Sequence, residues 1–381
     1  MNHPARLAAA IFAFAVAIPA MAQQRPVAIV GLVELSGTGA TAGTNFDNGV
    51  KLAVKEINVA GGILGRKIEY TSMDTQSNPG VAKALAQKAV DQGAYVVMGP
   101  VFSGSIIVSM AETKRAEIPN FTGGEAAGIT QQGNPYVFRT SFTQSTAMPK
   151  VAKYIKDAVK ANSVAMIWVN NDFGKGGRDM MAKALDAQGI KVVADIPTDP
   201  GQVDFSGAVL KAKQSGADAL FVYTNEEESA RALRELKKQG YDKPIIGETT
   251  LTGQKVIELA GDAANGAVAH VGLTVDAPQP TIKAFDQKFQ GEYKYKSDHN
   301  GMKGYSGMYV VKAITEKIGK TDSKAFAAAM KGAKISTKDH PGVLLDVSFD
   351  QNGDLDRESF LVKVENGKQV VTSTLPPASA K

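Results

Sequence analysis

Two serines follow a short apolar segment, at a point where the chain is predicted to change from strand to helix. Residues 95–98 are typical of a buried strand, and Ser103 and Ser105 lie close to the start of a helix predicted over residues 105–116. Free N–H groups and the helix dipole favour an anion at such a position. A ligand carboxylate could accept hydrogen bonds there from a serine hydroxyl and from the amides. The alternative is an ordinary capping serine.

A second polar group follows the apolar strand predicted over residues 219–222. Asn225 and Glu226 lie in the next loop. In an open α/β sheet, ligands bind outside the carboxyl ends of the strands, so this loop is expected to face a ligand. Three successive glutamates, residues 226–228, are also a favourable acidic start for the following helix. The loop therefore predicts either ligand contacts or a helix start.

Enzyme motifs are not assembled in this sequence. The absence of cysteine excludes a disulfide scaffold, an iron–sulfur cluster and a cysteine nucleophile, and no G-x-S-x-G elbow occurs. Gly37, Gly39 and Gly43 follow the first strand, but the third glycine is one position late for a dinucleotide fingerprint. The Gly319-Lys320 pair lacks the earlier glycine of a P-loop. We expect no catalytic residue and no nucleotide cofactor.

Metal and nucleic-acid sites are not expected either. The histidines at 270, 299 and 340 are far apart, whereas a zinc site needs three or four ligands. Residues 350–354 are superficially similar to a calcium loop, but their glycine stands at the fourth position instead of the sixth. Lysines and arginines (43) barely outnumber acids (38) and are scattered among them, which is not a nucleic-acid footprint.

The remaining pattern predicts the elements that must position these loops. The chain has 381 residues, of which 44% are hydrophobic, enough for about two or three domains. Apolar strands alternate with helices from residue 27 to about 116 and again from about 145 to 246, which predicts parallel sheets with helices on both faces. After residue 267 we expect helices over residues 281–289, 305–318 and 323–330 and late strands. This tail is too short for a third core and should complete the first two.

The first 22 residues have the features of a secretory signal peptide. Arg6 precedes twelve uncharged apolar residues, Leu7–Ile18, and the triplet Ala20-Met21-Ala22 follows. The apolar run is too short to span a membrane, which takes about 20 residues. We expect cleavage after Ala22, a periplasmic location and no membrane insertion.

Short motifs run in one order along almost the whole mature chain. They are Asn58–Glu69, Asp74–Pro79, Gly99-Pro100, Asn171–Gly174, Asp204-Phe205 and Phe349–Asp354. Together, behind a signal peptide, they resemble the signatures of type I periplasmic substrate-binding proteins of the leucine/isoleucine/valine-binding kind. The resemblance implies an α/β fold of two Rossmann-like lobes joined by three hinge crossings, with the ligand trapped between the lobes. By analogy, lobe one would comprise residues 26–142 and 271–355, and lobe two residues 143–270 and 356–381.

The resemblance also implies ligand contacts. Ser103 falls where the family contacts the ligand carboxylate, and Gly123 and Gly124 lie in its second carboxylate-binding loop, where glycines allow close approach of backbone amides. Glu125, or Ala126 in the next register, replaces the threonine of that loop.

Further positions depart from the family or are ambiguous by one residue. Phe173 stands where the family often has a cleft tyrosine, and Glu248 or Thr249 falls near its ammonium-binding carboxylate. Ala42 takes the place of an aromatic residue, which leaves room for a longer ligand.

The charges of these loops favour a zwitterionic ligand. Glu125, Glu226 and Glu248 face the cleft without an arginine or lysine in the same segments, and a purely anionic ligand would be repelled. We therefore expect a monomeric extracytoplasmic receptor that closes on a small carboxylate, a branched-chain or other apolar amino acid, for the permease of an ABC importer. The alternatives are an amine-free aromatic carboxylate or an amide as ligand, a secreted Rossmann-type enzyme, and a sensory module.

Overall fold

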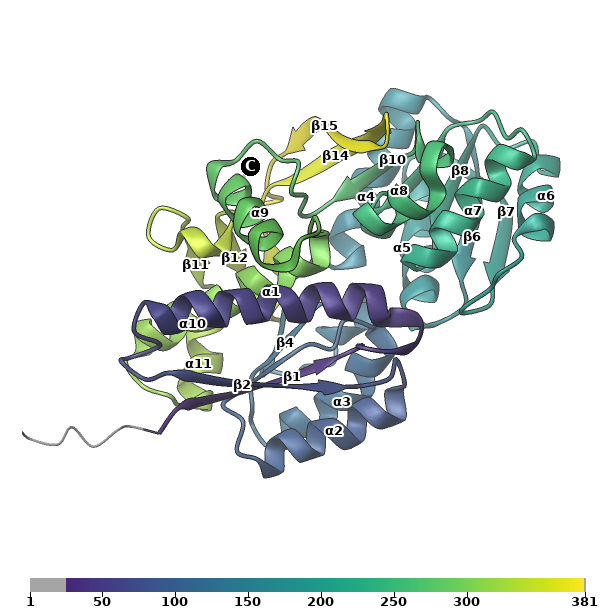
Figure 1. Ribbon diagram of the computed structural model, residues 1–381. Coiled ribbons are helices and arrows are strands. Elements are labelled where there is room, and N and C mark those ends of the chain that lie inside the picture. The colour runs from purple at the N-terminus through teal and green to yellow at the C-terminus, as the bar shows by residue number, and fades with distance from the viewer. Residues whose placement is uncertain (1–24, 380–381) are drawn as a thin grey trace, which may run out of the picture.

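The apolar runs of the sequence form the buried strands of two α/β lobes (Figure 1). The computed structural model describes residues 25–379, so the signal peptide expected over residues 1–22 lies outside the described residues. Each lobe is a twisted sheet covered by helices on both faces, as the alternation of strands and helices predicted.

The first lobe contains a five-stranded parallel sheet in the order β2-β1-β3-β4-β5. Its strands are β1 (Val27–Val33), β2 (Ile68–Asp74), β3 (Val96–Met98), β4 (Asn120–Thr122) and β5 (Val137–Arg139). One face is covered by α1 (Ala40–Val59) and α10 (His299–Ile318), the other by α2 (Pro79–Asp91) and α3 (Ser103–Arg115). Strand β1 is buried on both faces because Ile29 packs with the α1 and α10 side chains and Val30 with those of α2.

The second lobe contains a seven-stranded sheet in the order β15-β14-β10-β9-β8-β6-β7. Its strands are β6 (Ser163–Val169), β7 (Lys191–Thr198), β8 (Ala219–Tyr223), β9 (Ile245–Glu248), β10 (Val268–Val271), β14 (Ser359–Glu365) and β15 (Lys368–Leu375). The pairs β10–β14 and β14–β15 are antiparallel and the rest parallel. Its helices are α4 (Gln144–Tyr154), α5 (Asp172–Ala187), α6 (Ser206–Gln214), α7 (Glu226–Lys238) and α8 (Gln254–Ala260).

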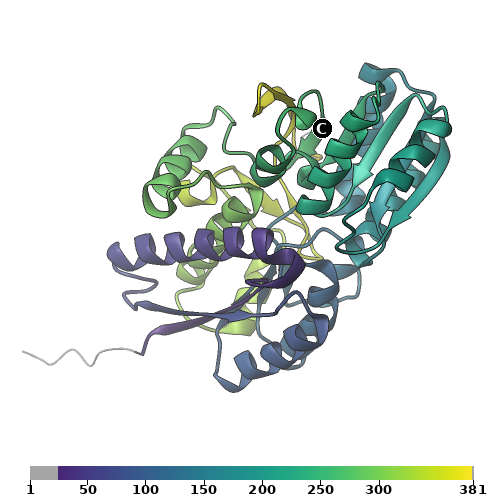
Figure 2. The ribbon, with the colours of Figure 1, turned by 45° about the vertical axis from the view of Figure 1, so that its right-hand side comes forward.

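The tail returns to both lobes, as expected. It adds α9 (Pro280–Tyr293), α10, α11 (Ser323–Met330) and the small sheet β11 (Lys334–Ile335), β12 (Val347–Phe349) and β13 (Leu355–Asp356) to the first lobe. The strands β14 and β15 then join the second sheet. The chain thus passes between the lobes three times: from β5 to α4, from β10 to α9 and from β13 to β14 (Figure 2). The residue bounds predicted for the two lobes remain a prediction.

Three helices that follow an Asp or Asn residue begin earlier than the sequence pattern predicts. Helix α10 begins at His299 instead of Tyr305, α7 at Glu226 instead of Glu228, and α5 at Asp172 instead of about residue 177. Each start has a side-chain cap at the preceding residue, and for α10 the Asp298 carboxylate accepts hydrogen bonds from the first-turn amides of residues 300 and 301 at 2.7 and 3.2 Å. These early starts place several polar residues in the first turns of helices.

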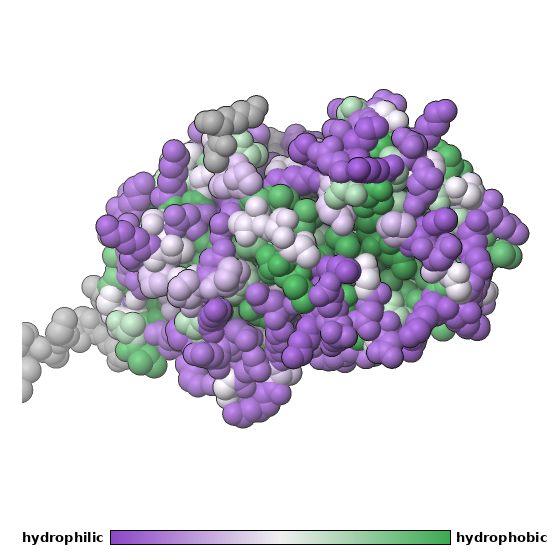
Figure 3. Space-filling model, turned by 90° about the horizontal axis from the view of Figure 1, so that it is seen from above, coloured by the Kyte–Doolittle hydropathy of each residue, from purple (hydrophilic) through white to green (hydrophobic). Residues whose placement is uncertain are grey.

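Polar side chains dominate the outline of the molecule in the view from above, and hydrophobic residues are visible mainly towards its middle (Figure 3). Within residues 25–379, no helix combines the length and the apolar character needed to cross a membrane.

Candidate ligand-binding site

A cavity of about 270 Å³ lies between the two lobes, at the carboxyl ends of the strands of both sheets. The first lobe contributes segments after β1, β2, β3 and β4, the second lobe segments after β6, β7, β8 and β9, and the first turns of α10 complete the wall. This is the place where open α/β sheets bind ligands. Eight of the ten expected ligand contacts line it: Ser103, Ser105, Gly123, Gly124, Glu125, Phe173, Asn225 and Glu226.

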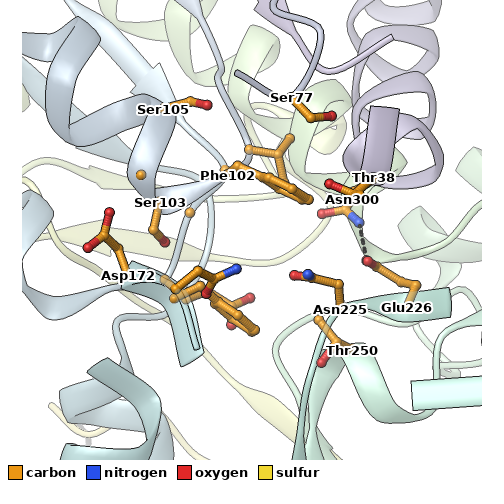
Figure 4. A pocket seen from close by; sticks show the side chains of 18 of the residues that line it. Thr38, Ser77, Phe102, Ser103, Ser105, Asp172, Asn225, Glu226, Thr250 and Asn300 are labelled. Atoms are coloured by element: carbon orange, nitrogen blue, oxygen red, sulfur yellow. Dashed lines mark hydrogen bonds between the residues drawn. The ribbon is translucent and has the colours of Figure 1, made fainter. Parts of the chain in front are cut away.

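The amino end of α3 forms one side of the cavity (Figure 4). Phe102 is the N-cap and makes no side-chain capping bond, so neither Ser103 nor Ser105 is a capping serine. The Ser103 hydroxyl accepts a hydrogen bond from the Ala126 N–H at 3.3 Å, and its own hydrogen remains available to a ligand. The Ser105 Oγ is buried and has no partner among the described residues. Two hydroxyls and the free amides of a first helical turn can therefore meet an anion here.

The loop that follows β4 is held in place by Arg139, a buried residue at the end of β5. Its guanidinium donates to the carbonyl oxygens of Gly124 and Ala126 at 2.8 and 2.7 Å and forms an ion pair with Asp354. The amide of Gly123, which we expected to approach the ligand, instead donates to the Pro100 carbonyl at 2.9 Å. The loop is thus rigidly supported, but the Gly123 amide is already used inside the protein.

Glu125 is paired with a lysine that the sequence pattern did not indicate. Its Oε1 lies 3.0 Å from the Nζ of Lys303, on α10, and its Oε2 accepts a hydrogen bond from the Tyr223 hydroxyl at 3.2 Å. Burial and repulsion by Glu248 nevertheless raise the pKa of Glu125 to about 7. Lys303 is itself buried and lines the cavity. Glu125 therefore has a protein cation beside it, although no arginine or lysine lies in the predicted cleft segments themselves.

Glu248 and Thr249 do not line this cavity. Glu248 ends β9, and its carboxyl is bonded to Thr249 (N and Oγ1, 2.6 and 2.7 Å) and to the Nδ1 of His270 at 3.1 Å. Burial raises the pKa of Glu248 and lowers that of His270 to about 3, so the ring is neutral and its Nδ1–H donates. Both residues lie instead beside a much smaller cavity near the hinge, and Thr250 takes their place in the main one.

Glu226 and Asn300 form the side of the cavity opposite Ser103 (Figure 4). Glu226 lies in the first turn of α7, where Asn225 caps the helix through a capping box with Glu228. The Glu226 Oε1 accepts a hydrogen bond from the Asn300 Nδ2 at 3.3 Å. Burial and the negative charge of Asp298 raise the pKa of Glu226 to about 8.

Aromatic side chains form the apolar part of the wall. Phe102 comes from the first lobe and Phe173 from the second, and the ring of Phe173 stacks on Tyr223 with the centroids 4.2 Å apart. Ala42 lines the cavity as expected, and its small side chain leaves space beside these rings.

Hydrogen bonds at and beside the cavity join the lobes. They connect Glu125 to Tyr223, Asn300 to Glu226, and the Thr41 hydroxyl to the Glu227 carboxylate at 2.7 Å. The structure therefore has the two walls closed against each other.

Lys303 and Asn300 were not predicted as site residues because the helix that contains them was expected to begin at Tyr305 instead of His299. The available signal was Asp298, a favourable N-cap residue. Two glycines in the first turns, at 301 and 304, argued against a helix there.

The described part of the chain has no cluster of metal-ligating side chains, and the two cavity serines are not activated. Residues 25–379 contain no group of three or more potential metal-ligating side chains. Ser103 is bonded to a backbone amide and Ser105 to no group, so neither has the adjacent base that a nucleophilic serine needs.

Comparisons with known proteins agree with this architecture. The profile of the family described as periplasmic binding protein matches residues 26–369. The Leu/Ile/Val-binding protein BraC3 of Rhizobium johnstonii is 30% identical over 345 residues, which cover 90% of this chain and 92% of that protein.

Solved structures share the fold. The branched-chain amino acid transporter substrate-binding protein LivJ of Streptococcus pneumoniae, in complex with isoleucine, superposes with a TM-score of 0.82 at 24% identity, covering 92% of this chain and 99% of that one. A solute-binding protein of R. palustris in complex with benzoate gives 0.84 at 22% identity, covering 93% and 98%. Because the family profile spans most of the sequence and the fold and the cavity between the lobes agree with it, this chain belongs to the periplasmic binding protein family.

Proposed function

We propose that this protein is an extracytoplasmic receptor that closes on a small carboxylate ligand, an amino acid, and delivers it to the permease of an ABC importer. It binds its ligand without transforming it. The export signal expected over residues 1–22 would place the mature protein, beginning at Gln23, in the periplasm.

The observation that carries this proposal is the cavity with a wall from each lobe. A ligand there contacts both sheets at once and is enclosed only when the lobes meet, and three crossings between the lobes provide a hinge. The anion-binding end of α3 accounts for a carboxylate, and the acidic side chain of Glu226 accounts for an amine. The amino-acid binding of relatives such as BraC3 supports the same ligand class.

A second candidate ligand is an amine-free aromatic carboxylate. Phe102 and Phe173 line the cavity, and Lys303 neutralises one of its glutamates, so a ligand amine is not required at Glu125. The benzoate complex of a protein with the same fold is consistent with such a ligand.

Calorimetry and solution scattering test the proposal together. Leucine and phenylalanine would be titrated beside 4-methylpentanoate and 3-phenylpropanoate, which lack the amine, and beside benzoate. We expect the amino acids to bind at least about tenfold more tightly, the contribution of one charge-assisted hydrogen bond. We also expect the radius of gyration to fall on binding.

Tighter binding of the amine-free acids would favour the aromatic carboxylate. An unchanged radius of gyration with a tightly bound ligand would contradict closure.

A further inference from the structure

Glu226 is a cavity-lining carboxyl group without a cationic partner in the described part of the chain. It is 4% exposed, and no ion pair within residues 25–379 includes it. The charged groups that face it are Asp298 from the N-cap of α10, Glu227 from its own helix and Lys303 from α10. Two of these repel its negative charge, and Lys303 is engaged by Glu125 and by the Gly123 carbonyl at 3.0 and 3.3 Å. An ionised Glu226 therefore needs a cation from outside the protein.

Asn300 provides a second, independent sign of a ligand at the same place. Its Nδ2 is used by Glu226, but its Oδ1 is buried and has no hydrogen-bond partner among the described residues. Asn300 is 1% exposed and lines the cavity. An orphaned buried acceptor beside an uncompensated carboxyl group suits one kind of ligand group, a nitrogen that carries several N–H donors.

This pair lies across the cavity from the end that suits an anion. In Figure 4, Ser103 and Ser105 lie on one side with α3, and Glu226 and Asn300 lie on the other with the open part of the cavity between them. The carboxyl group of Glu248, which the sequence favoured as the ammonium partner, is bonded behind the wall to Thr249 and His270. Within the described residues, an amine close to the ligand carboxylate can pair with Asp172 beside Ser103, but that carboxylate is exposed, whereas an amine at the other end of the ligand meets the buried Glu226.

We propose that Glu226 and Asn300 form the subsite for a cationic nitrogen, and that this nitrogen stands at the end of the ligand remote from its carboxylate. The preferred ligand is then an ω-amino acid, with the carboxylate at Ser103 and Ser105 and the amine at Glu226. This inference rests on the proposed function in taking the ligand to be a carboxylate bound at α3. A bound ammonium stabilises the ionised form of Glu226, so the proton that Glu226 holds in the empty cavity is released to solvent.

Three compounds with the same five-carbon chain test this placement: 5-aminopentanoate, 2-aminopentanoate and pentanoate. Titration calorimetry of the full mature protein should show 5-aminopentanoate binding at least about tenfold more tightly than either of the others. Glu226→Gln should remove this preference. Glu235→Gln, on the same helix but outside the cavity and bonded to Gln239, is the matched control and should retain it. Thermal unfolding of both variants verifies that they are folded.

Equal or tighter binding of 2-aminopentanoate by the unaltered protein overturns the inference and leaves the proposed function intact. The inference is also overturned if the Glu226→Gln variant binds 5-aminopentanoate with an affinity within about twofold of that of the unaltered protein. If none of these carboxylates, nor leucine, phenylalanine or benzoate, binds at millimolar concentration, the carboxylate function itself fails and the inference fails with it.

Discussion

Lys303 gives the cavity a positive charge that no loop after a strand supplies. Its Nζ lies 3.0 Å from Glu125, and both side chains are almost fully buried. Breaking a buried ion pair from one side leaves an uncompensated charge and typically costs about 3–5 kcal/mol. The lysine therefore stabilises the acidic centre of the closed molecule as well as lining the ligand cavity.

Replacing Lys303 by methionine should lower the free energy of unfolding by about 3 kcal/mol. The loss should be larger at pH 8 than at pH 6. Lys303 lowers the pKa of Glu125, so without it the carboxyl group ionises in the folded protein at still higher pH, and stability is lost as the pH rises. Lys312→Met is the matched control on the same helix, because its pair with Glu316 is partly exposed and should contribute less than about 1 kcal/mol. Urea unfolding at both pH values measures these effects; equal losses in the two variants would contradict the role of Lys303.

Ser103→Ala should weaken ligand binding by about 10- to 150-fold, the contribution of a hydrogen bond to a charged group. The protein should remain folded, because the hydroxyl makes one long bond, to the Ala126 amide. Ser109→Ala is the control within α3: its hydroxyl is buried and bonds to the Ile106 carbonyl, away from the cavity. Calorimetry with leucine or 5-aminopentanoate measures the change. An affinity within about twofold of the unaltered protein would leave Ser103 without a ligand role.

At the scale of elements, the contact between α1 and α10 determines where the polar residues of α10 lie. The two helices approach so closely that a Cβ on Gly49 would lie 1.9 Å from the Gly301 carbonyl, and one on Gly304 would lie 2.1 Å from the Phe46 carbonyl. Glycines that disfavour a helix in isolation are thus required by its packing. This contact holds the first turns of α10 between the lobes, where Asn300 and Lys303 reach the cavity.

Gly304→Ala should therefore destabilise the protein by about 1–3 kcal/mol, since the added methyl group forces α1 and α10 apart. Gly291→Ala is a control of opposite sign. Its position in α9 is open, with nothing within 4 Å of an added Cβ, so the better helix propensity of alanine should stabilise the protein by roughly 0.5–1 kcal/mol. Chemical denaturation compares the two variants. Similar effects of both would show that the helix contact is looser than the structure describes.

At the scale of the whole molecule, several buried carboxyl groups lie at or beside the ligand cavity. Burial raises the pKa of Glu34 to about 7, that of Glu125 to about 7 and that of Glu226 to about 8. The folded protein therefore holds protons that the unfolded chain releases near its usual glutamate pKa. His270 and His299, whose pKa values are lowered by burial, act in the opposite sense, but only below about pH 6.5.

Stability should consequently fall as the pH rises from 6.5 to 8. In this window the folded state binds more protons than the unfolded state, so the free energy of unfolding decreases with pH, with a total loss on the order of 2 kcal/mol. Urea denaturation at several pH values in the absence of ligand measures the slope. Glu226→Gln should make the slope shallower because it removes the group with the highest of these pKa values. A stability that is constant or rises over this range would show that these carboxyl groups are ionised in the folded protein.

The sequence by itself determined the architecture and most of the lining of the cavity. Alternating apolar strands and helices predict two open sheets, and the carboxyl ends of their strands are where Ser103, Glu125 and Glu226 were expected and where they lie. These are local patterns, because a loop that directly follows a strand is placed by that strand. The order of the short motifs indicated the relationship to periplasmic binding proteins, and that relationship implied the crossings between the lobes.

Only the tertiary structure decided the charge of the cavity. Lys303 meets Glu125 across 178 positions of sequence, and Asn300 meets Glu226 across 74. Glu248 lies two positions before Thr250, which lines the cavity, but its own carboxyl group is turned to His270. The contacts of Lys303 and Asn300 depend on how α10 packs against α1. The contact of Glu248 depends on which face of the sheet its side chain points to, and successive side chains of a strand point to opposite faces. Spacing along the chain therefore locates the cavity, while packing between distant segments determines which charges face the ligand.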